Sequence, residues 1–159
     1  MELYVRSFRE LTTDELYDIY KLRVAVFVVE QNCPYQEIDD ADREAYHLFL
    51  KDEAGIAAYL RVLPPGVAGQ DTAIGRVIAA RRGRGLGKKI LGEGIRVALE
   101  KFSARTIALA AQAYAVPFYE KLGFRPVSDL FLEDGIPHIR MIWQDGDAQN
   151  PDTQATKGS

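Results

Sequence analysis

The nine residues RRGRGLGKK, at positions 81–89, hold five cationic side chains and three glycines. They follow TAIGRVIAA, 72–80, a β-rich run whose internal Gly75 indicates a bulge or a close backbone approach. They lead into residues 84–101, where apolar side chains recur at helical spacing. A strand, a glycine-rich turn and a helix start together favour phosphate, because the first backbone N–H groups of a helix are free and its dipole is positive there.

The turn does not match the best-known phosphate motifs. It lacks the Gly-Lys-Ser/Thr ending of a Walker A loop, and a dinucleotide fingerprint would need a small residue where Lys88 stands. Arg82, Arg84 and Lys88 or Lys89 could still neutralise a phosphate. Taken alone, the turn also fits a solvated basic helix start, so its neighbours must decide.

The neighbouring segments predict one layered α+β domain. A capping box at Thr12 and Glu15 begins a helix that we expect to end near Glu30. Glycines 92 and 94 interrupt the 84–101 helix, and close packing against a neighbour is a plausible reason for them. The remaining elements expected are a strand at 3–8, a hairpin at 45–65 turning at 52–55, a strand at 105–111, a helix at 115–123, and two or three strands within 124–143 around the turn 133–135.

The segment CPYQEIDDADRE, 33–44, is predicted to be a long polar surface loop. We interpret its run of Asp39, Asp40 and Asp42 as solvated, and Cys33 as an ordinary loop residue. Two distant histidines and one cysteine do not have the spacing of metal ligands, so no metal site is proposed.

Composition narrows the class of protein. The chain has 159 residues, 47% of them apolar and 27% charged, with a net charge of −3, so overall charge gives no support to a nucleic-acid partner. We expect a domain at 1–144 and a disordered polar tail at 145–159. The single cysteine, the lack of a leader-like start and the lack of a long apolar run predict a cytoplasmic protein with no membrane partner.

The pattern Arg82-x-x-Gly85-x-Gly87, directly after a strand with an internal glycine, resembles the acetyl-CoA signature of the GNAT superfamily of N-acetyltransferases. Further along, PFYEKLGF (117–124) resembles that superfamily's second recurrent segment. The chain is most similar to the ElaA-like family, through FVVEQNCPYQEIDDAD (27–42), AYHL (45–48), IGRV (74–77), AQAYAVPFYEKLGF (111–124) and EDGIPH (133–138). These segments are independent of one another and occur in the family's order.

This resemblance implies a three-layer α+β fold, in which helices flank a strongly twisted mixed sheet that splays open at its centre. The co-substrate acetyl-CoA would lie in the opening, between the strands 72–80 and 105–111. The turn before Arg82 is about two residues shorter than the family pattern, so either the strand ends earlier or the pyrophosphate loop is tightened. The residues that the resemblance assigns to acetyl-CoA are Val77, Ile78, Ala79, Arg82, Gly83, Arg84, Gly85, Leu86, Gly87, Lys88, Gln112 and Tyr119.

The implied reaction is attack of a neutral amine on the thioester, which needs an acid for the leaving thiolate and a base for the amine's proton. The resemblance gives the role of acid to Tyr119; the alternative is a core tyrosine. For the base we consider Glu30 and His47, with a solvated glutamate, a packed histidine or a relay through water as alternatives.

Three further polar residues could serve the same site. Gln112 could bind cofactor or acceptor, and Glu133 with His138 could line the acceptor side, although a structural role is equally consistent with Gln112 and favoured for His138.

Two other functions compete with an enzyme. The same fold could serve as a catalytically silent module that binds acetyl-CoA and regulates, and the cationic turn could bind RNA, although the acidic total argues against RNA. The acidic residues 37–44 with Glu30 suggest a cationic acceptor, either a small molecule or a peptide amine. The resemblance also implies a possible homodimer.

Overall fold

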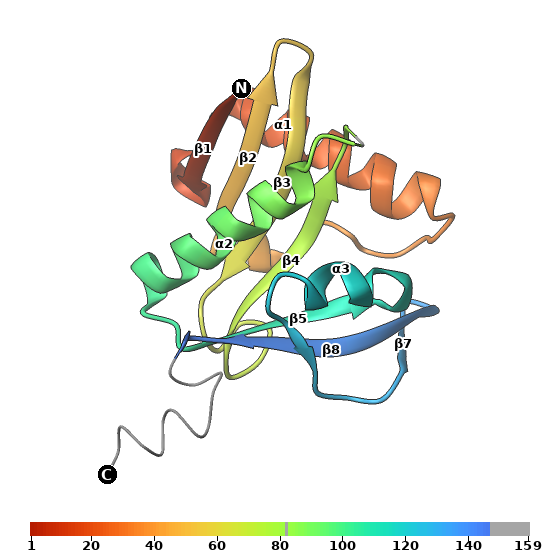
Figure 1. Ribbon diagram of the computed structural model, residues 1–159. Helices are drawn as coiled ribbons and strands as arrows, with labels where there is room; N and C mark the ends of the chain where they lie inside the picture. The colour runs from red at the N-terminus through yellow and green to blue at the C-terminus, as the bar shows by residue number, and fades with distance from the viewer. Residues whose placement is uncertain (82, 147–159) are drawn as a thin grey trace.

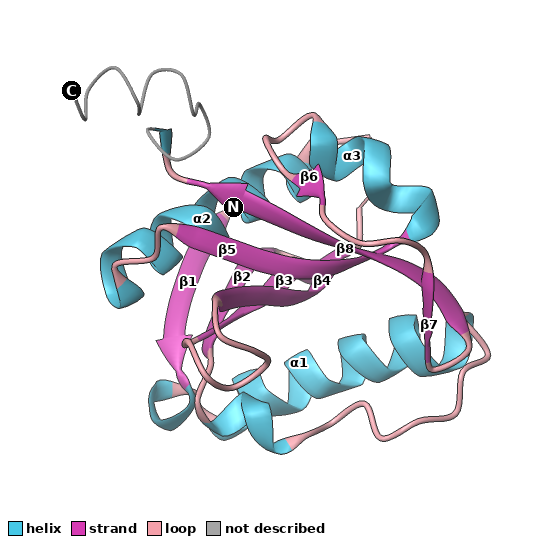
Figure 2. Ribbon diagram, turned by 90° about the horizontal axis from the view of Figure 1, so that it is seen from below, coloured by secondary structure: helices cyan, strands magenta, loops and turns pink. Residues whose placement is uncertain are grey.

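The computed structural model describes residues 1–81 and 83–146. Arg82 and residues 147–159 of the expected tail therefore lie outside the described residues. The β-sheet lies between helix α1 on one face and helices α2 and α3 on the other (Figure 2), which confirms the three-layer α+β architecture.

The eight strands found in the described residues belong to one mixed sheet of order β1-β2-β3-β4-β5-β8-β6, with β7 paired to β8. Every neighbouring pair is antiparallel except β4 and β5. The strands are Glu2–Ser7 (β1), Tyr46–Asp52 (β2), Gly55–Leu63 (β3), Thr72–Ala79 (β4), Thr106–Gln112 (β5), Arg125–Pro126 (β6), Phe131–Glu133 (β7) and Ile136–Gln144 (β8). The predicted hairpin at 45–65 is thus β2 and β3.

Helix α1 begins where the sequence predicts. The Thr12 side chain accepts the Glu15 backbone N–H at 3.0 Å, and the Glu15 carboxylate accepts the Thr12 N–H at 2.9 Å, so the capping box is present. The helices are α1 (Thr13–Val24), which continues as the π-helical turn η2 (Ala25–Glu30), α2 (Leu86–Phe102) and α3 (Val116–Glu120), with short 3-10 turns at η1 (Phe8–Glu10), η3 (Asp40–Arg43) and η4 (Ala113–Ala115). Within 1–81 and 83–146, no helix has the length and apolarity needed to cross a bilayer.

The sheet splays open between its two parallel strands, as the resemblance implies. β4 pairs with β5 only where Thr72 lies opposite Ile107 and Ala73 lies opposite Ala108. Beyond these residues the two strands diverge (Figure 1). Among the described residues, no strand therefore pairs with the edge of β4 from Gly75 to Ala79 that faces β5.

Helix α2 packs closely on the sheet at one of its two internal glycines. A Cβ at Gly94 would lie 2.9 Å from a methyl carbon of Leu60, which is fully buried. A Cβ at Gly92 would meet nothing within 4 Å. The expectation of close packing is confirmed for Gly94 and wrong for Gly92.

The segment 33–44 is not the solvated loop predicted from its polarity. Glu37 and Asp42 are only 2% and 1% exposed. Arg23 on α1 donates to Asp42 at 2.7 Å and to Glu37 at 2.9 Å, and Arg61 on β3 donates to Asp39 at 2.6 Å. Three carboxylates of the segment are thus neutralised by three arginines from α1, β3 and β4, and we call these six residues the ion cluster: Arg23, Glu37, Asp39, Asp42, Arg61 and Arg76.

Candidate active site

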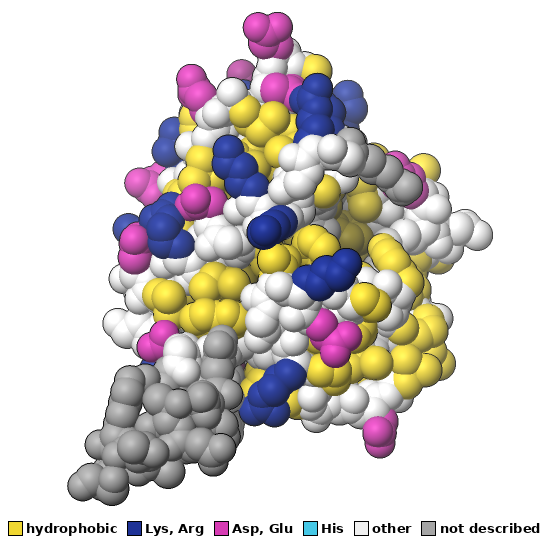
Figure 3. Space-filling model, viewed as in Figure 1, with side chains coloured by type: hydrophobic (Ala, Val, Ile, Leu, Met, Phe, Trp, Pro, Cys, Tyr) yellow, Lys and Arg dark blue, Asp and Glu magenta, His cyan; other side chains and the backbone are white. Residues whose placement is uncertain are grey.

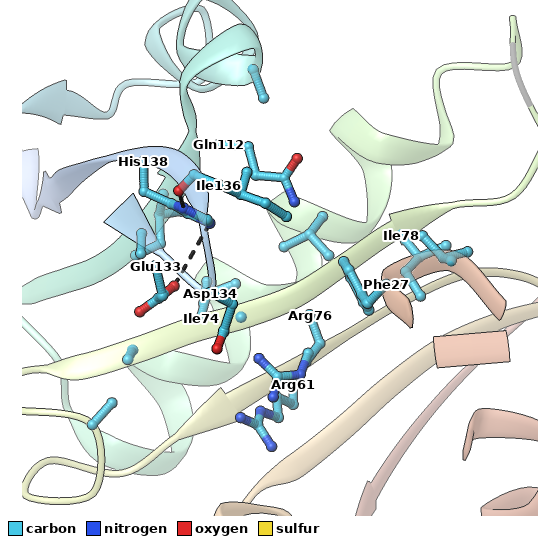
Figure 4. Close-up of a pocket in the computed structure, with 18 of the residues that line it drawn as sticks. Phe27, Arg61, Ile74, Arg76, Ile78, Gln112, Glu133, Asp134, Ile136 and His138 are labelled. Carbon is cyan, nitrogen blue, oxygen red and sulfur yellow. Dashed lines mark hydrogen bonds and ion pairs between the residues drawn. The ribbon is translucent and has the colours of Figure 1, made fainter. Parts of the chain in front are cut away.

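A cavity of about 1170 Å³ occupies the place where β4 and β5 diverge. It is lined by residues of α1 and η2, the diverging strands, α3, and the turn between β7 and β8. Figure 4 shows Glu133 and His138 on one side of this cavity and Ile78 with Phe27 at its other end. On the molecular surface, apolar side chains lie in a hollow between the start of α2 and α3, with Lys and Arg side chains around it (Figure 3).

A bulge in β4 forms one wall of the cavity. Opposite β3, the register moves from Gly75 facing Arg61 to Ile78 facing Tyr59, which inserts one extra residue in β4. The bulge predicted from Gly75 is therefore present. Val77, Ile78 and Ala79, which the resemblance assigns to acetyl-CoA, all line the cavity.

The glycine-rich turn has a backbone suited to an anion. Gly83 and Gly85 have φ of 77° and 66°, in the left-handed region that glycine adopts without strain. Gly85 is the N-cap of α2 and supplies no side-chain acceptor, so N–H groups of the first helical turn are open to a ligand. This turn adjoins the cavity through Ala79 and Ala80, which line it.

The side chains of the turn differ in what they can offer. Leu86 is buried and can present only its backbone, whereas Lys88 is exposed. Gly87 lies against Phe118, whose ring carbon Cζ would be 3.1 Å from a Cβ there. The assignment of Arg82 lies outside the described residues.

Sequence reasoning missed the residue that holds this turn in place. Asp52, at the end of β2, accepts two hydrogen bonds from Arg81, at 2.9 and 2.8 Å, and lies 4.0 Å from Arg84. The hydrogen bonds from Arg81 lower the pKa of Asp52 to about 2. Asp52 and Arg81 are 29 positions apart, so no local sequence pattern indicates that they pair.

Tyr119 projects from α3 toward the cavity. It is 9% exposed, lines the cavity, and lies edge-on between the rings of Phe118 and Phe124. Burial raises the pKa of its hydroxyl to about 12. A phenol that stays protonated at neutral pH can donate a proton or a hydrogen bond to a leaving sulfur atom.

Glu30, considered as the base, and His138, considered as a residue of the acceptor side, both line the cavity. Glu30, at the end of η2, is exposed there. His138 is 8% exposed; its Nδ1 lies 2.7 Å from the Ile136 carbonyl and its Nε2 lies 3.6 Å from Glu133. Because a carbonyl only accepts, Nδ1 must carry the proton, and Nε2 of the neutral ring is left as an acceptor.

His47 is not brought to the cavity. It is fully buried, with Nδ1 2.7 Å from the Tyr59 hydroxyl and Nε2 2.9 Å from the Asp42 carbonyl, and it is not part of the cavity lining. Burial lowers the pKa of His47. Both ring nitrogens are occupied by the structure, so the prediction of His47 as a base is corrected to a packed histidine beside the ion cluster.

Two side-chain hydrogen bonds between lining residues connect the segment after η2 to β5 and to the turn between β7 and β8. The Gln112 side chain donates to Gln31 at 3.2 Å, and the Cys33 thiol donates to the Asp134 carbonyl at 3.2 Å. Cys33 is 7% exposed rather than part of an open loop. Within the described parts of the chain, no group of three or more His, Cys, Asp or Glu side chains could hold a metal ion.

The charges of the cavity differ from those expected. The carboxylates of 37–44, which suggested a cationic acceptor, are largely neutralised in the ion cluster. Arg76 and Arg140 each pair with a carboxylate. Among the described residues, the lining carboxylates of Glu30 and Asp134 have no ion-pair partner.

Comparison with known proteins agrees with this geometry. Residues 13–144 match the family model of the acetyltransferase (GNAT) domain. The chain is 41% identical to a UPF0039 protein of Schizosaccharomyces pombe over 145 residues, which cover 89% of this chain and 95% of that protein. It is 39% identical to the protein ElaA of Escherichia coli over 136 residues, which cover 83% and 89%.

Solved structures give the same result. The crystal structure of Escherichia coli ElaA has a TM-score of 0.83 and 36% identity, covering 90% of this chain and 99% of that chain. An acyl-CoA N-acyltransferase from Pseudomonas aeruginosa also has a TM-score of 0.83 and 36% identity, with the same coverage.

Proposed function

Since the chain belongs to the GNAT acetyltransferase family, as an ElaA-like member, we propose that it transfers the acetyl group of acetyl-CoA to a primary amine. The observation that carries this proposal is the cavity between β4 and β5, which joins an unpaired strand edge to a protonated tyrosine. Family membership supports acyl transfer in general; the acetyl group and the amine are the finer proposal.

The described residues fit coenzyme A. Gly83 and Gly85 leave space for an anion at the open start of α2, where Arg84 and Lys88 can add positive charge. The backbone of β4 along Val77–Ala79 can pair with the pantetheine amides, since no strand of the described residues occupies that edge. We therefore retain the cofactor assignments for the described turn and for β4.

The proposed reaction forms one bond, breaks one bond and needs two proton transfers. The amine nitrogen attacks the thioester carbon, the carbon–sulfur bond breaks, and the leaving thiolate takes the proton of the Tyr119 hydroxyl. The proton released by the nitrogen goes to Glu30 or to Nε2 of His138, and solvent returns a proton to Tyr119. Backbone N–H groups at the bulge would stabilise the negative charge on the carbonyl oxygen.

The acceptor is proposed to carry positive charge beside its reacting amine. Glu30 and Asp134 supply the supporting negative charge, in place of the neutralised carboxylates of 37–44. Both are exposed lining residues, so a cationic amine can reach them.

A thiol-release assay with a panel of cationic, neutral and anionic amines tests the function, together with calorimetric titration of acetyl-CoA. One-to-one binding that is lost in the Gly85→Asp variant, with fastest turnover on cationic amines, is the expected result. Binding without turnover on any amine would favour the silent regulatory module instead. Equal or faster turnover on anionic amines would contradict the proposed acceptor class.

A further inference from the structure

The β4 bulge contains a non-glycine residue in a strained conformation. Arg76 has φ of 55°, in the left-handed region that residues with a side chain rarely adopt. Such conformations persist where surrounding contacts hold them, and they often occur at functional sites. Since Arg76 directly precedes Val77, its conformation sets the direction of the backbone groups that line the cavity.

Glu37 holds the Arg76 side chain at two points. Nε of Arg76 donates to the Glu37 carboxylate, and Nη2 donates to the Glu37 backbone carbonyl at 2.9 Å. The Tyr35 ring lies 5.8 Å from the guanidinium carbon. Arg76 is therefore fixed mainly through a two-point contact with Glu37, and its Nη2 also lies 3.4 Å from the Asp39 carboxylate.

Glu37 is in turn fixed from the opposite side. Arg23 on α1 donates to its carboxylate at 2.9 Å and to its carbonyl at 3.2 Å. The Glu37 side chain is only 1% exposed, and Glu37 is not among the residues that line the cavity. It can therefore influence the cavity only through the residues it contacts.

We propose that Glu37 is a positioning residue for acyl transfer, which acts through Arg76 to hold the β4 bulge in register with the cavity. This inference rests on the proposed function of the cavity. Donors at the bulge stabilise the reacting carbonyl only if they point at it, so their misalignment weakens transition-state binding. On the proposed function, the phosphates of the cofactor bind at the turn before α2, which Glu37 does not contact.

Loss of the Glu37 contact should lower kcat and leave the affinity for the cofactor nearly unchanged. We expect Glu37→Gln to lower kcat about 10-fold, a fraction of the ~100-fold or more that complete loss of an oxyanion donor costs. The dissociation constant of acetyl-CoA should change by less than about 2-fold, because an interaction made mainly in the transition state affects kcat alone.

A double-mutant cycle separates positioning from a direct effect of Arg76 on substrate. Arg76→Gly removes the side chain, accommodates the left-handed backbone and leaves the pair between Arg23 and Glu37 in place. If Glu37 acts through Arg76, the double variant should have the kcat of Arg76→Gly alone. Arg96→Ala, which removes exposed ion pairs on the outer face of α2, is the matched control and should keep the kcat of the parent protein.

Amide hydrogen exchange of residues 74–80 gives a readout that does not depend on turnover. Glu37→Gln and Arg76→Gly should exchange faster there than Arg96→Ala. Unchanged exchange and kcat in Arg76→Gly would overturn the inference, even if Glu37→Gln fails to fold. Multiplicative losses in the double variant would also overturn it. A parent protein that turns over no amine would refute the proposed function alone, while exchange would still decide whether Glu37 holds the bulge.

Discussion

Burial shifts the pKa of Tyr119 and the pKa of His47 in opposite directions. Burial raises the pKa of Tyr119 to about 12, which keeps a proton available at the cavity. Burial lowers the pKa of His47, which favours the neutral ring. The difference is access: Tyr119 lines the cavity and His47 does not.

Replacing Tyr119 by Phe should lower kcat about 100-fold, within the usual range for loss of a general acid. The acetyl-CoA dissociation constant should stay within about 2-fold, because the ring and its packing are kept. Steady-state kinetics and calorimetry check both values. Since the pKa is about 12, the parent rate should show no loss due to Tyr119 ionisation between about pH 7 and 10. An unchanged kcat in the Phe variant would refute the role of acid.

His47 should make the folded protein less stable as the pH falls below neutrality. Its folded pKa is lower than the ordinary histidine value of 6.5, so the unfolded chain binds a proton that the folded chain does not. Its contribution is complete above about pH 6.5 and is lost as the pH falls through the folded pKa, by at most about 1.4 kcal/mol per pH unit. Urea unfolding at pH 7 and pH 5 should show this slope in the parent and a smaller one in His47→Gln. Equal slopes would mean that His47 protonates in the folded protein.

The elements of the fold were predicted where their signals are local. The capping box at Thr12, the hairpin turn at 52–55 and the glycines of the cationic turn each depend on neighbours within a few positions. The ion cluster depends on arginines from three elements, so the polarity of 33–44 alone indicated a solvated loop. Asp52 beside Arg81 was missed for the same reason.

Helix α2 offers a matched pair of substitutions. Gly94→Ala should destabilise the protein by about 1–3 kcal/mol, because the new Cβ would lie 2.9 Å from a Leu60 methyl carbon in a filled core. Gly92→Ala, with nothing within 4 Å, should stabilise it by about 0.5–1 kcal/mol through helix propensity. Chemical denaturation of both variants measures the difference. A stabilised Gly94→Ala protein would show that Leu60 can move away without cost.

At the scale of the whole molecule, the opening between β4 and β5 divides the sheet. Strands β1 to β4 form one antiparallel unit, and β5 with β6, β7 and β8 forms another. They pair only over Thr72–Ala73 and Ile107–Ala108. A ligand in the opening would contact both units.

Acetyl-CoA at about 100 times its dissociation constant should therefore stabilise the protein by about 2.7 kcal/mol against unfolding. Hydrogen exchange should slow in both 74–80 and 107–112, on the two sides of the opening. The thermal unfolding temperature should rise in parallel, and should not rise in the Gly85→Asp variant. Slowed exchange confined to one unit would place the ligand outside the opening.

The narrow pairing between β4 and β5 also has a consequence for how the chain is made. Residues 1–102 contain β1 to β4 with α1 and α2, so a ribosome releases one complete unit before β5 emerges. Synthesis runs at about 5–20 residues per second, which leaves that unit a few seconds with the edge of β4 uncovered. The nascent chain has then already formed one wall of the cavity, and β5 with the strands that follow it supplies the other.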